Sequence, residues 1–341
     1  MLSNPICCFT IVVMLVFSGA ARASNHEAFY KGKTVRVIVG VSPGGGYDTY
    51  ARTIARHMGK HIAGSPTIIV ENMPGAGSLK SANFLYRVAK PDGLTIGHFI
   101  GGLFLQQLLG QPGVDFEAPR FGFIGVPAQD DAHLGLHRAT GIASVEQWLA
   151  AKTPIKFGGI GPGVSSDDIP KVLKETLGLP LQLVSGYKGT ADVRLAFNSG
   201  EVQGATLSWQ SFKATWRQEL ETALVNIVLS AGLKPHPDLP KVPLALHLVK
   251  AEEGRKMLRT VIQVHGPSVR PFVVPPATPK ERVEILGRAF LATMKDPEFV
   301  ADATKARLEL NPLSGEELAK SVSEIFQLEA GLVGKLKGIL R

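Results

Sequence analysis

The sequence of 341 residues contains only two cysteines, Cys7 and Cys8, both within its first ten positions. Cysteine catalysis, thiolate metal sites and disulfide scaffolds are therefore excluded for the rest of the chain. Lys and Arg occur singly and form no tract or basic-aromatic stripe, so a formal net charge of +8 does not indicate a nucleic-acid partner. Hydrophobic residues make up 45% of the chain and charged residues 19%, which is typical of a globular protein.

Long apolar runs are also scarce, and the single prominent one spans residues 6–20. The small-x-small pattern of residues 21–23 follows it, and together they predict a secretory signal peptide over residues 1–23, cleaved after Ala23. The run is shorter than the roughly 20 residues that a membrane span needs, and no later stretch approaches that length. We therefore expect an exported protein that is free in the periplasm and has lost both cysteines.

Short β-branched runs recur along the chain, and helical patterns separate them. Strands that alternate with helices predict βαβ units and mainly parallel sheets. These runs lie at residues 34–40, 67–71, 94–99, 154–159, 181–186 and 225–230. Amphipathic patterns at residues 279–295, 297–306 and 315–335 predict helices that wrap on a finished sheet.

The length of the chain favours two lobes rather than one domain. Two stretches, near residues 126–132 and 265–276, are the expected crossings between the lobes. The first crossing and the return predict that residues 24–128 and 270–341 form lobe 1 and that residues 129–269 form lobe 2.

Three consecutive glycines, Gly44 to Gly46, follow the first predicted strand and precede a helix. Glycine lets a ligand approach the backbone, and the free N–H groups of a helix start attract anions, so the segment predicts an anion-binding turn. A tight turn capped by Asp48 is the alternative. The same stretch contains the G-x-S-x-G pattern of a hydrolase elbow, but Pro43 has no N–H for an oxyanion and restricts Ser42 to extended conformations. A secreted α/β hydrolase is therefore a rival hypothesis only.

Two further glycine-rich turns follow predicted strands, at residues 71–78 and 158–168. None of the three turns contains a P-loop or a dinucleotide-binding pattern. Ligands of α/β proteins bind at the carboxyl ends of parallel strands and in clefts between domains, so the three turns predict one shared site. The pattern indicates capture by backbone amides rather than catalysis, and no cofactor or metal is expected.

Six motifs occur in order, at residues 43–48, 71–77, 91–93, 158–166, 187–191 and 200–202. Their order and spacing resemble the substrate-binding receptors of tripartite tricarboxylate transporters, the Bug family, over essentially the whole mature chain. The resemblance implies an α/β fold of the two-lobed periplasmic-binding-protein kind, a type II-like Venus flytrap with a mainly parallel sheet in each lobe.

The resemblance further implies a non-enzymatic receptor that captures a small organic acid in the cleft and delivers it to the large and small membrane subunits of a transporter. We expect a monomer without a nucleic-acid partner. An extracytoplasmic sensor that reports to a signalling protein is an alternative that the sequence does not separate from a transport receptor. The residues implied to hold the ligand are Gly44, Gly45, Gly46, Tyr47, Asp48, Gly75, Ala76, Gly77, Ser78, Gly161, Gly163, Ser165, Ser166, Asp167, Tyr187, Lys188 and Gly189.

The third turn departs from the family pattern. Members often read G-S-S-G-x-G-T-S-S-H, whereas this chain has Gly159, Ile160, Val164 and Asp167 in place of two serines, the threonine and the histidine. An aspartate that faces the cleft would repel a dicarboxylate, which favours a less acidic or amphoteric ligand. The alternative is that Asp167 and Asp168 only cap the start of the helix.

Several other side chains have two interpretations. Tyr47 narrows the pocket or faces the core, His98 reaches the cleft or stays internal, and Trp209 forms a cleft wall or a core contact. His57 and His61 have a spacing that can bind metal, but no third ligand lies between them, so ordinary surface histidines are the expectation.

Overall fold

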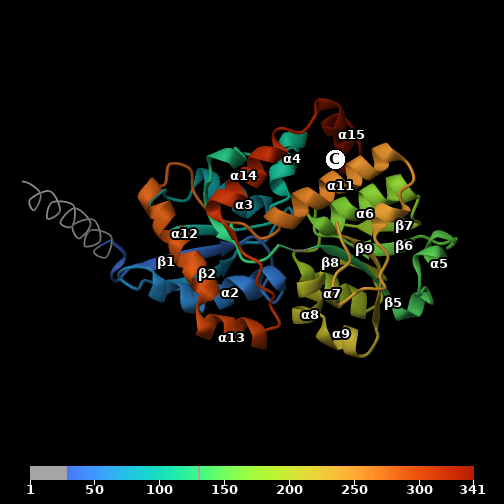
Figure 1. Ribbon diagram of the computed structural model, residues 1–341, viewed down its shortest axis with the longest axis horizontal. Coiled ribbons are helices and arrows are strands. Elements are labelled where there is room, and N and C mark those ends of the chain that lie inside the picture. Colours follow the sequence, from blue (N-terminus) through green and yellow to red (C-terminus); the bar gives the residue numbers. More distant parts are fainter. Residues whose placement is uncertain (1–28, 130) are drawn as a thin grey trace, which may run out of the picture.

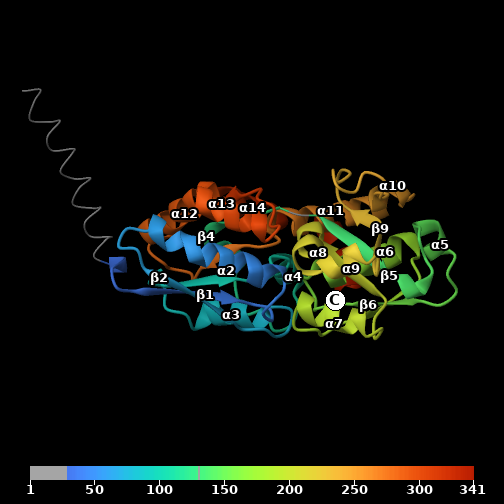
Figure 2. The same cartoon turned by 90° about the horizontal axis from the view of Figure 1, so that it is seen from below.

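The computed structural model describes residues 29–129 and 131–341. The predicted signal peptide, with Cys7 and Cys8, lies outside the described residues. Figure 1 shows two α/β lobes side by side, and Figure 2 shows the same arrangement from below. The two-lobed α/β fold expected from the sequence is confirmed.

Lobe 1 contains a six-stranded sheet of order β11-β4-β10-β3-β1-β2. β1 pairs in parallel with β2 and β3, whereas β10 runs antiparallel to β3 and β4, and β11 antiparallel to β4. The sheet is therefore mixed, and strands from the end of the chain complete it. Its strands are β1 (Thr34–Val39), β2 (Thr67–Asn72), β3 (Thr95–His98), β4 (Gly122–Val126), β10 (Phe272–Val274) and β11 (Leu313–Ser314).

Lobe 2 contains a five-stranded sheet of order β7-β6-β8-β5-β9. β6 pairs in parallel with β7 and β8, whereas β5 runs antiparallel to β8 and β9. This sheet is also mixed, because the strand that enters the lobe runs against the others. Its strands are β5 (Ala132–His137), β6 (Ile155–Gly158), β7 (Leu181–Val184), β8 (Gly204–Ser208) and β9 (Val225–Ala231).

Helices cover both sheets (Figures 1 and 2). The helices that follow the strands of lobe 1 are α2 (Gly46–Met58), α3 (Leu79–Arg87), α4 (Leu103–Leu109), α12 (Lys280–Lys295), α13 (Pro297–Lys305) and α14 (Gly315–Ile325), with the short η1 (Gly59–His61) and η2 (Ala118–Arg120). The helices that follow the strands of lobe 2 are α5 (Val145–Leu149), α6 (Ser165–Leu177), α7 (Thr190–Asn198), α8 (Trp209–Thr215), α9 (Arg217–Glu221), α10 (Ala245–Leu248) and α11 (Glu252–Ser268), with η3 (Arg138–Thr140). The last helix, α15 (Ala330–Leu340), contacts both α4 and α6.

Local sequence signals explain several of these elements. The apolar face of α2 is buried as its periodicity predicts, including Tyr50 and Ile54. Ser314 and Glu317 form a capping box at the start of α14. Thr278 does not cap α12, because its hydroxyl donates to a carbonyl of its own turn instead. The helix predicted over 315–335 is two helices, α14 and α15.

Two strands next to the first crossing, β4 and β5, were not predicted. β4 contains Gly122 and Gly125 and β5 contains Gly135, and glycine weakens the strand pattern. The chain passes from β4 in one sheet to β5 in the other through residues 127–131, and it returns between α11 and β10. The lobe limits at residues 128/129 and 269/270 stay a prediction.

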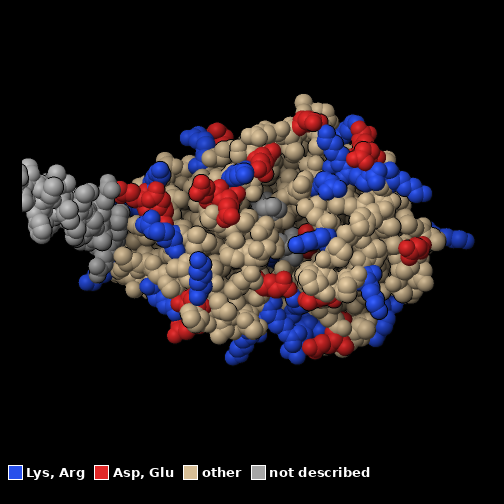
Figure 3. Space-filling view, viewed as in Figure 1, with Lys and Arg blue, Asp and Glu red and all other residues tan. Residues whose placement is uncertain are grey.

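The buried hydrophobic residues join the two lobes instead of forming two isolated cores. One cluster contains Leu85 beside β3 and Leu134 of β5, and the other contains Val37 of β1 and Leu207 of β8. No helix among the described residues combines the length and the apolar character needed to cross a bilayer. On the face shown in Figure 3, basic and acidic side chains are interspersed.

His133 lies in β5, between β8 and β9 of the lobe 2 sheet, and is fully buried. Neither ring nitrogen has a hydrogen-bond partner among the described residues. Burial, together with the nearby His236, lowers the pKa of His133 to about 3. The unfolded chain, in which a histidine has a pKa of about 6.5, therefore binds more protons than the folded protein between these two values.

We expect the free energy of unfolding to fall as the pH falls from about 6.5 towards 3, with His133 contributing about 1.4 kcal/mol per pH unit. Replacing His133 by leucine should flatten this dependence, as measured by urea unfolding at several pH values. Leu134→Ala, in the same strand, is the control and should lower stability by roughly 2–5 kcal/mol at every pH. An unchanged pH slope in His133→Leu would contradict the prediction.

Candidate ligand-binding site

The first glycine-rich turn connects β1 to α2 and is held by Asp48. Gly44 has a positive φ of 83°, where glycine is favoured, and the extended Gly45 precedes the helix. The buried Asp48 carboxylate accepts the N–H of Gly44 at 2.9 Å and hydrogen bonds from Arg52 and Asn72. Burial opposes ionisation, but the hydrogen bonds from Arg52 and from the turn outweigh it and hold the pKa of Asp48 below its ordinary value. Asp48 thus caps the turn, as the alternative interpretation expects.

Gly46 and Tyr47 face the return crossing and lobe 2. The Tyr47 hydroxyl donates to the carbonyl of Val269, and its ring lies 5.3 Å from that of His98. The side chain is 9% exposed and packs in the core, which agrees with the core-facing interpretation. A Cβ at Gly46 would lie 2.4 Å from Ser211 Oγ, so glycine lets α2 come close to α8.

The second turn, between β2 and α3, contains four consecutive residues with positive φ. They are Gly75 (140°), Ala76 (47°), Gly77 (59°) and Ser78 (73°). Non-glycine residues adopt this region at an energetic cost, and such strain concentrates at functional sites. The Ser78 hydroxyl donates to the carbonyl of Gly40 at 3.0 Å and ties the turn to the end of β1.

The third turn, between β6 and α6, is built around two buried aspartates. Asp167 accepts the N–H groups of Ile160 at 2.7 Å and Gly161 at 2.9 Å. Asp168 accepts the N–H of Gly163 at 3.2 Å. Both aspartates lie in the first turn of α6, so their side chains fold back onto the glycine turn before it. They satisfy amides of the turn, as the capping interpretation expects.

Ser165 and Ser166 lie inside α6, whose N-cap is Val164, so neither serine caps the helix. Ser166 Oγ accepts a backbone N–H of the turn at 3.2 Å and donates to Asp167 at 2.9 Å. Burial raises the pKa of Asp167, against the opposing effect of hydrogen bonds from Ser185 and the turn.

The fourth turn, residues 187–189, precedes α7. The Tyr187 hydroxyl donates to Glu201, and burial together with this carboxylate raises the pKa of Tyr187 to about 12. The Lys188 side chain is exposed, while its carbonyl accepts the N–H of Ser42 at 3.0 Å. A Cβ at Gly189 would lie 2.6 Å from Ser42 Oγ, so this turn lies against the first turn.

The carboxyl ends of the parallel strands of the two sheets therefore face each other. A Cβ at Gly161 would lie 3.2 Å from the backbone nitrogen of Gly77, which places the third turn against the second. A Cβ at Gly45 would lie 2.4 Å from Thr190 Oγ1, at the start of α7. The structure thus brings turns of both lobes into direct contact, as a shared site requires.

A cavity of about 980 Å³ lies elsewhere, on the face where Figure 3 shows the molecule hollowed between the lobes. None of the ligand-binding residues expected from the sequence lines it. Its lining comes from both crossings, α8, α11, α14 and the loop after β9, and includes Asp131, Gln210, Lys234, His236, Glu309 and Asn311. This cavity is separate from the glycine turns.

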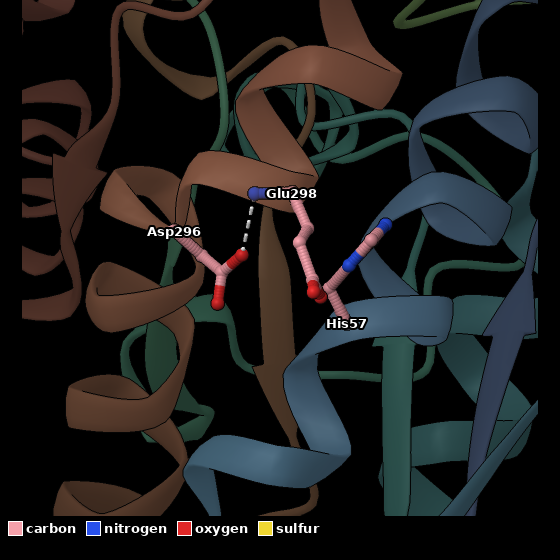
Figure 4. A group of neighbouring side chains, drawn as sticks. All are labelled: His57, Asp296 and Glu298. Carbon is pink, nitrogen blue, oxygen red and sulfur yellow. Dashed lines mark hydrogen bonds between the residues drawn. The ribbon is translucent and has the colours of Figure 1, made fainter.

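Figure 4 shows a group of side chains, His57, Asp296 and Glu298, whose ligand atoms lie close enough together to hold a metal ion. The ammonium of Lys60 already lies between the carboxylates, 2.8 Å from Asp296 and 2.6 Å from Glu298. Its hydrogen bond holds the pKa of Asp296 well below its ordinary value. His57 binds Asp302 at 2.9 Å, so the group is an ion-pair network between α2 and α13.

The second such group consists of His236, Asp238 and Glu309. Lys213 forms ion pairs with both carboxylates, at 2.9 Å to Asp238. A cationic side chain again lies where a metal ion would bind, so neither group supports a metal site.

The structure shows the surroundings of three side chains for which the sequence left two interpretations. His98 is fully buried, stacks on a β10 phenylalanine at 4.2 Å and has a pKa lowered to about 3 by burial. Trp209 is 8% exposed, and its indole N–H donates to Asp238 at 2.7 Å. His61 binds Asp296 at 2.9 Å. Each of these three side chains thus contacts other residues of the same chain.

The comparison with known proteins decides the family. Residues 50–337 match the model of the tripartite tricarboxylate transporter family receptor. The chain belongs to this family.

Other receptors and relatives resemble the chain over most of its length. A UPF0065 protein of Agrobacterium vitis is 28% identical over 301 residues, which cover 85% of this chain and 80% of that protein. The periplasmic binding protein BugD has a TM-score of 0.74 at 23% identity, covering 91% of this chain and 99% of BugD. MatC of Rhodopseudomonas palustris, solved with bound malate, has a TM-score of 0.71 at 20% identity and the same coverage. A second R. palustris protein, Rpa4515, solved with adipate, has a TM-score of 0.73 at 19% identity, covering 90% and 98%.

The receptor family is one of binding proteins, so this chain is not an enzyme. The geometry around Ser42 agrees, because its hydroxyl donates to Asp192 of lobe 2 at 2.6 Å, whereas a serine nucleophile is activated by a base such as histidine. The hydrolase hypothesis is therefore wrong.

Sequence reasoning missed two residues of this receptor that bring the lobes together. Arg270 is 1% exposed and donates to Ser208 of lobe 2 at 2.7 Å. A single arginine within the strand-like run of residues 269–274 was the sequence feature that could have pointed to it. Gly102 precedes α4, and a Cβ there would lie 2.0 Å from the carbonyl oxygen of Gly163. No local pattern marked this contact, because its partner lies about 60 residues away in the sequence.

We expect Gly102→Ala to hold α4 and the third turn apart. Gly102 has an ordinary helical φ of −60°, so alanine causes no backbone strain, and the backbone carbonyl it would meet cannot rotate away as a side chain can. Overpacking costs about 1–3 kcal/mol, so ligand affinity should fall by roughly 5- to 150-fold. Small-angle scattering should show a larger radius of gyration.

The matched control is Gly287→Ala on α12, where a Cβ would lie 3.6 Å from the carbonyl oxygen of Ile124, an ordinary contact. This variant should scatter and bind as the parent protein does. Equal affinity and equal radius of gyration in Gly102→Ala would show that the contact between Gly102 and Gly163 is not needed for closure.

Proposed function

We propose that this protein is an extracytoplasmic receptor that captures a small organic acid between its lobes and delivers it to the membrane subunits of a tripartite transporter. Its membership of the receptor family supports this role. The observation that carries the proposal is the contact between glycine-rich turns at the strand ends of both sheets, including Gly77 against Gly161.

The backbone N–H groups of these turns that Asp48, Asp167 and Asp168 do not occupy are the proposed partners of the acid. Glycine leaves such groups accessible, and the starts of α2, α3 and α6 add a partial positive charge. Malate and adipate, the ligands of the two solved neighbours from R. palustris, are both carboxylic acids. The proposed site consists of the four turns at residues 44–48, 75–78, 161–167 and 187–189.

We further propose that the protein is periplasmic after cleavage of residues 1–23 and that it acts as a monomer. The periplasmic binding protein BugD, which shares the fold, supports this location. Residues 24–128 with 270–341 and residues 129–269 are the proposed lobes, joined by the two crossings. Closure of the lobes on the acid would present one surface to the membrane subunits.

Ligand binding should raise thermal stability by mass action, because only the folded protein binds the acid. We expect at least one acid in a panel of mono-, di- and tricarboxylates, aromatic acids and amino acids to raise the melting temperature. At a ligand concentration of 100 Kd the free energy of unfolding should rise by about 2.7 kcal/mol. Differential scanning fluorimetry measures the shift.

Amines of equal length that lack a carboxyl group are the ligand controls, and they should leave the melting temperature unchanged. A panel in which no acid shifts the melting temperature would count against the receptor proposal. If Gly102→Ala shows the same shift at the same ligand concentration, binding does not require the closed arrangement of the lobes.

A further inference from the structure

The third turn contains a carboxylate-binding arrangement that Asp167 of the same chain fills. Its Oδ2 atom accepts the N–H groups of Ile160 at 2.7 Å and Gly161 at 2.9 Å. The same oxygen accepts the Ser166 hydroxyl at 2.9 Å, and Oδ1 accepts the Ser185 hydroxyl. Two amides and two hydroxyls are the kind of donors by which proteins hold an external carboxylate.

Gly159 provides the space for this internal carboxylate. A Cβ at Gly159 would lie 2.7 Å from each oxygen of Asp167, so a side chain there would displace the carboxylate. Asp167 itself is 1% exposed. Gly159 and Asp167 therefore act as a pair, because the glycine leaves room for the aspartate. These two departures from the family pattern have the same structural cause.

The carboxylate of Asp167 lies directly behind the surface of the third turn that faces lobe 1. Gly161, whose N–H binds Asp167, is the residue that meets Gly77 of the second turn across the lobes. A ligand that binds the exposed side of these two turns would therefore have the Asp167 carboxylate directly behind the Gly161 amide.

We infer that Asp167 makes the third turn select against a second carboxylate, so that the ligand is a monoanionic acid whose far end is uncharged or cationic. This inference rests on the proposed function. The amides that would hold a second carboxylate are occupied, and a fixed negative charge lies behind them. A like charge within about 4–6 Å changes such an equilibrium by roughly 10- to 1,000-fold.

Dicarboxylates and their half-amides test this inference, because each pair has nearly the same shape and differs by one charge. Isothermal titration of the full chain with succinate and succinamate, glutarate and glutaramate, and adipate and adipamate gives the affinity ratio for each length. The parent protein should prefer the half-amide by about tenfold or more at the length that binds most tightly.

Asp167→Asn removes the charge and keeps one oxygen acceptor for the turn. The preference for the half-amide should fall by about tenfold or more in this variant. The control is Asp168→Asn, which removes the neighbouring buried carboxylate, whose second oxygen binds His265 at 3.1 Å. This control should change the ratio much less.

Ser185→Ala is a second variant in case Asp167→Asn does not fold, because Ser185 is exposed and only one hydroxyl is lost. In this variant Asp167 keeps its charge and loses one hydrogen-bond donor that partly neutralises it. The preference for the half-amide should therefore rise. Circular dichroism reports whether each variant is folded.

The outcomes separate the two proposals. Binding of dicarboxylates as tightly as half-amides by the parent protein, or a ratio that Asp167→Asn leaves unchanged, overturns the inference and leaves the proposed receptor function intact. A ratio that falls in Ser185→Ala also overturns the inference. A parent protein that binds no acid of the series and none of the wider panel overturns the proposed function, and the inference falls with it.

Discussion

Two sheets can bring the ends of their strands together only where no side chain stands between them. This constraint explains why glycine occurs on both sides of two close approaches, Gly77 with Gly161 and Gly102 with Gly163, and on one side of the others. Where backbone meets backbone, the N–H groups are the polar groups available for recognition. The few acidic side chains at these turns then decide which amides are left for a ligand, and Asp48 and Asp167 each take some of them.

The crossings between the lobes depend on a different kind of interaction. Arg270, at the return crossing, is buried with its guanidinium 4.9 Å from the ring centre of Tyr50 and 5.5 Å from that of Tyr47. It also donates to Ser208 and Ser211 of lobe 2. The hydrogen bonds to the two serines and the faces of the two tyrosine rings both stabilise this buried guanidinium. The return crossing is therefore a defined junction between α2 and α8 rather than a loose linker.

Much of the fold could be predicted from local sequence because its determinants are local. The β-branched runs of β1 and β2 and the capping box of α14 each lie within a few residues. β4 and β5 could not be found in this way, because a glycine in each weakens the strand pattern. The glycine turns were also visible, but whether Asp167 faces a ligand or its own turn depends on which staggered rotamer its side chain adopts in the folded protein. The contact of Gly102 with Gly163 depends on how two distant segments pack, which no local pattern records.

The last helix has a consequence for how far the lobes can separate. α15 contacts α4 on one side and α6 on the other, and Lys171 of α6 donates to the carbonyl of Leu340 at 3.1 Å. Any opening motion that parts α4 from α6 must detach the helix from one of them. If it travels with α6, the four residues between α14 and α15 become a tether, and a stretch of that length spans about 14 Å at most. The carboxyl-terminal segment thus limits how far the two lobes of the receptor can separate.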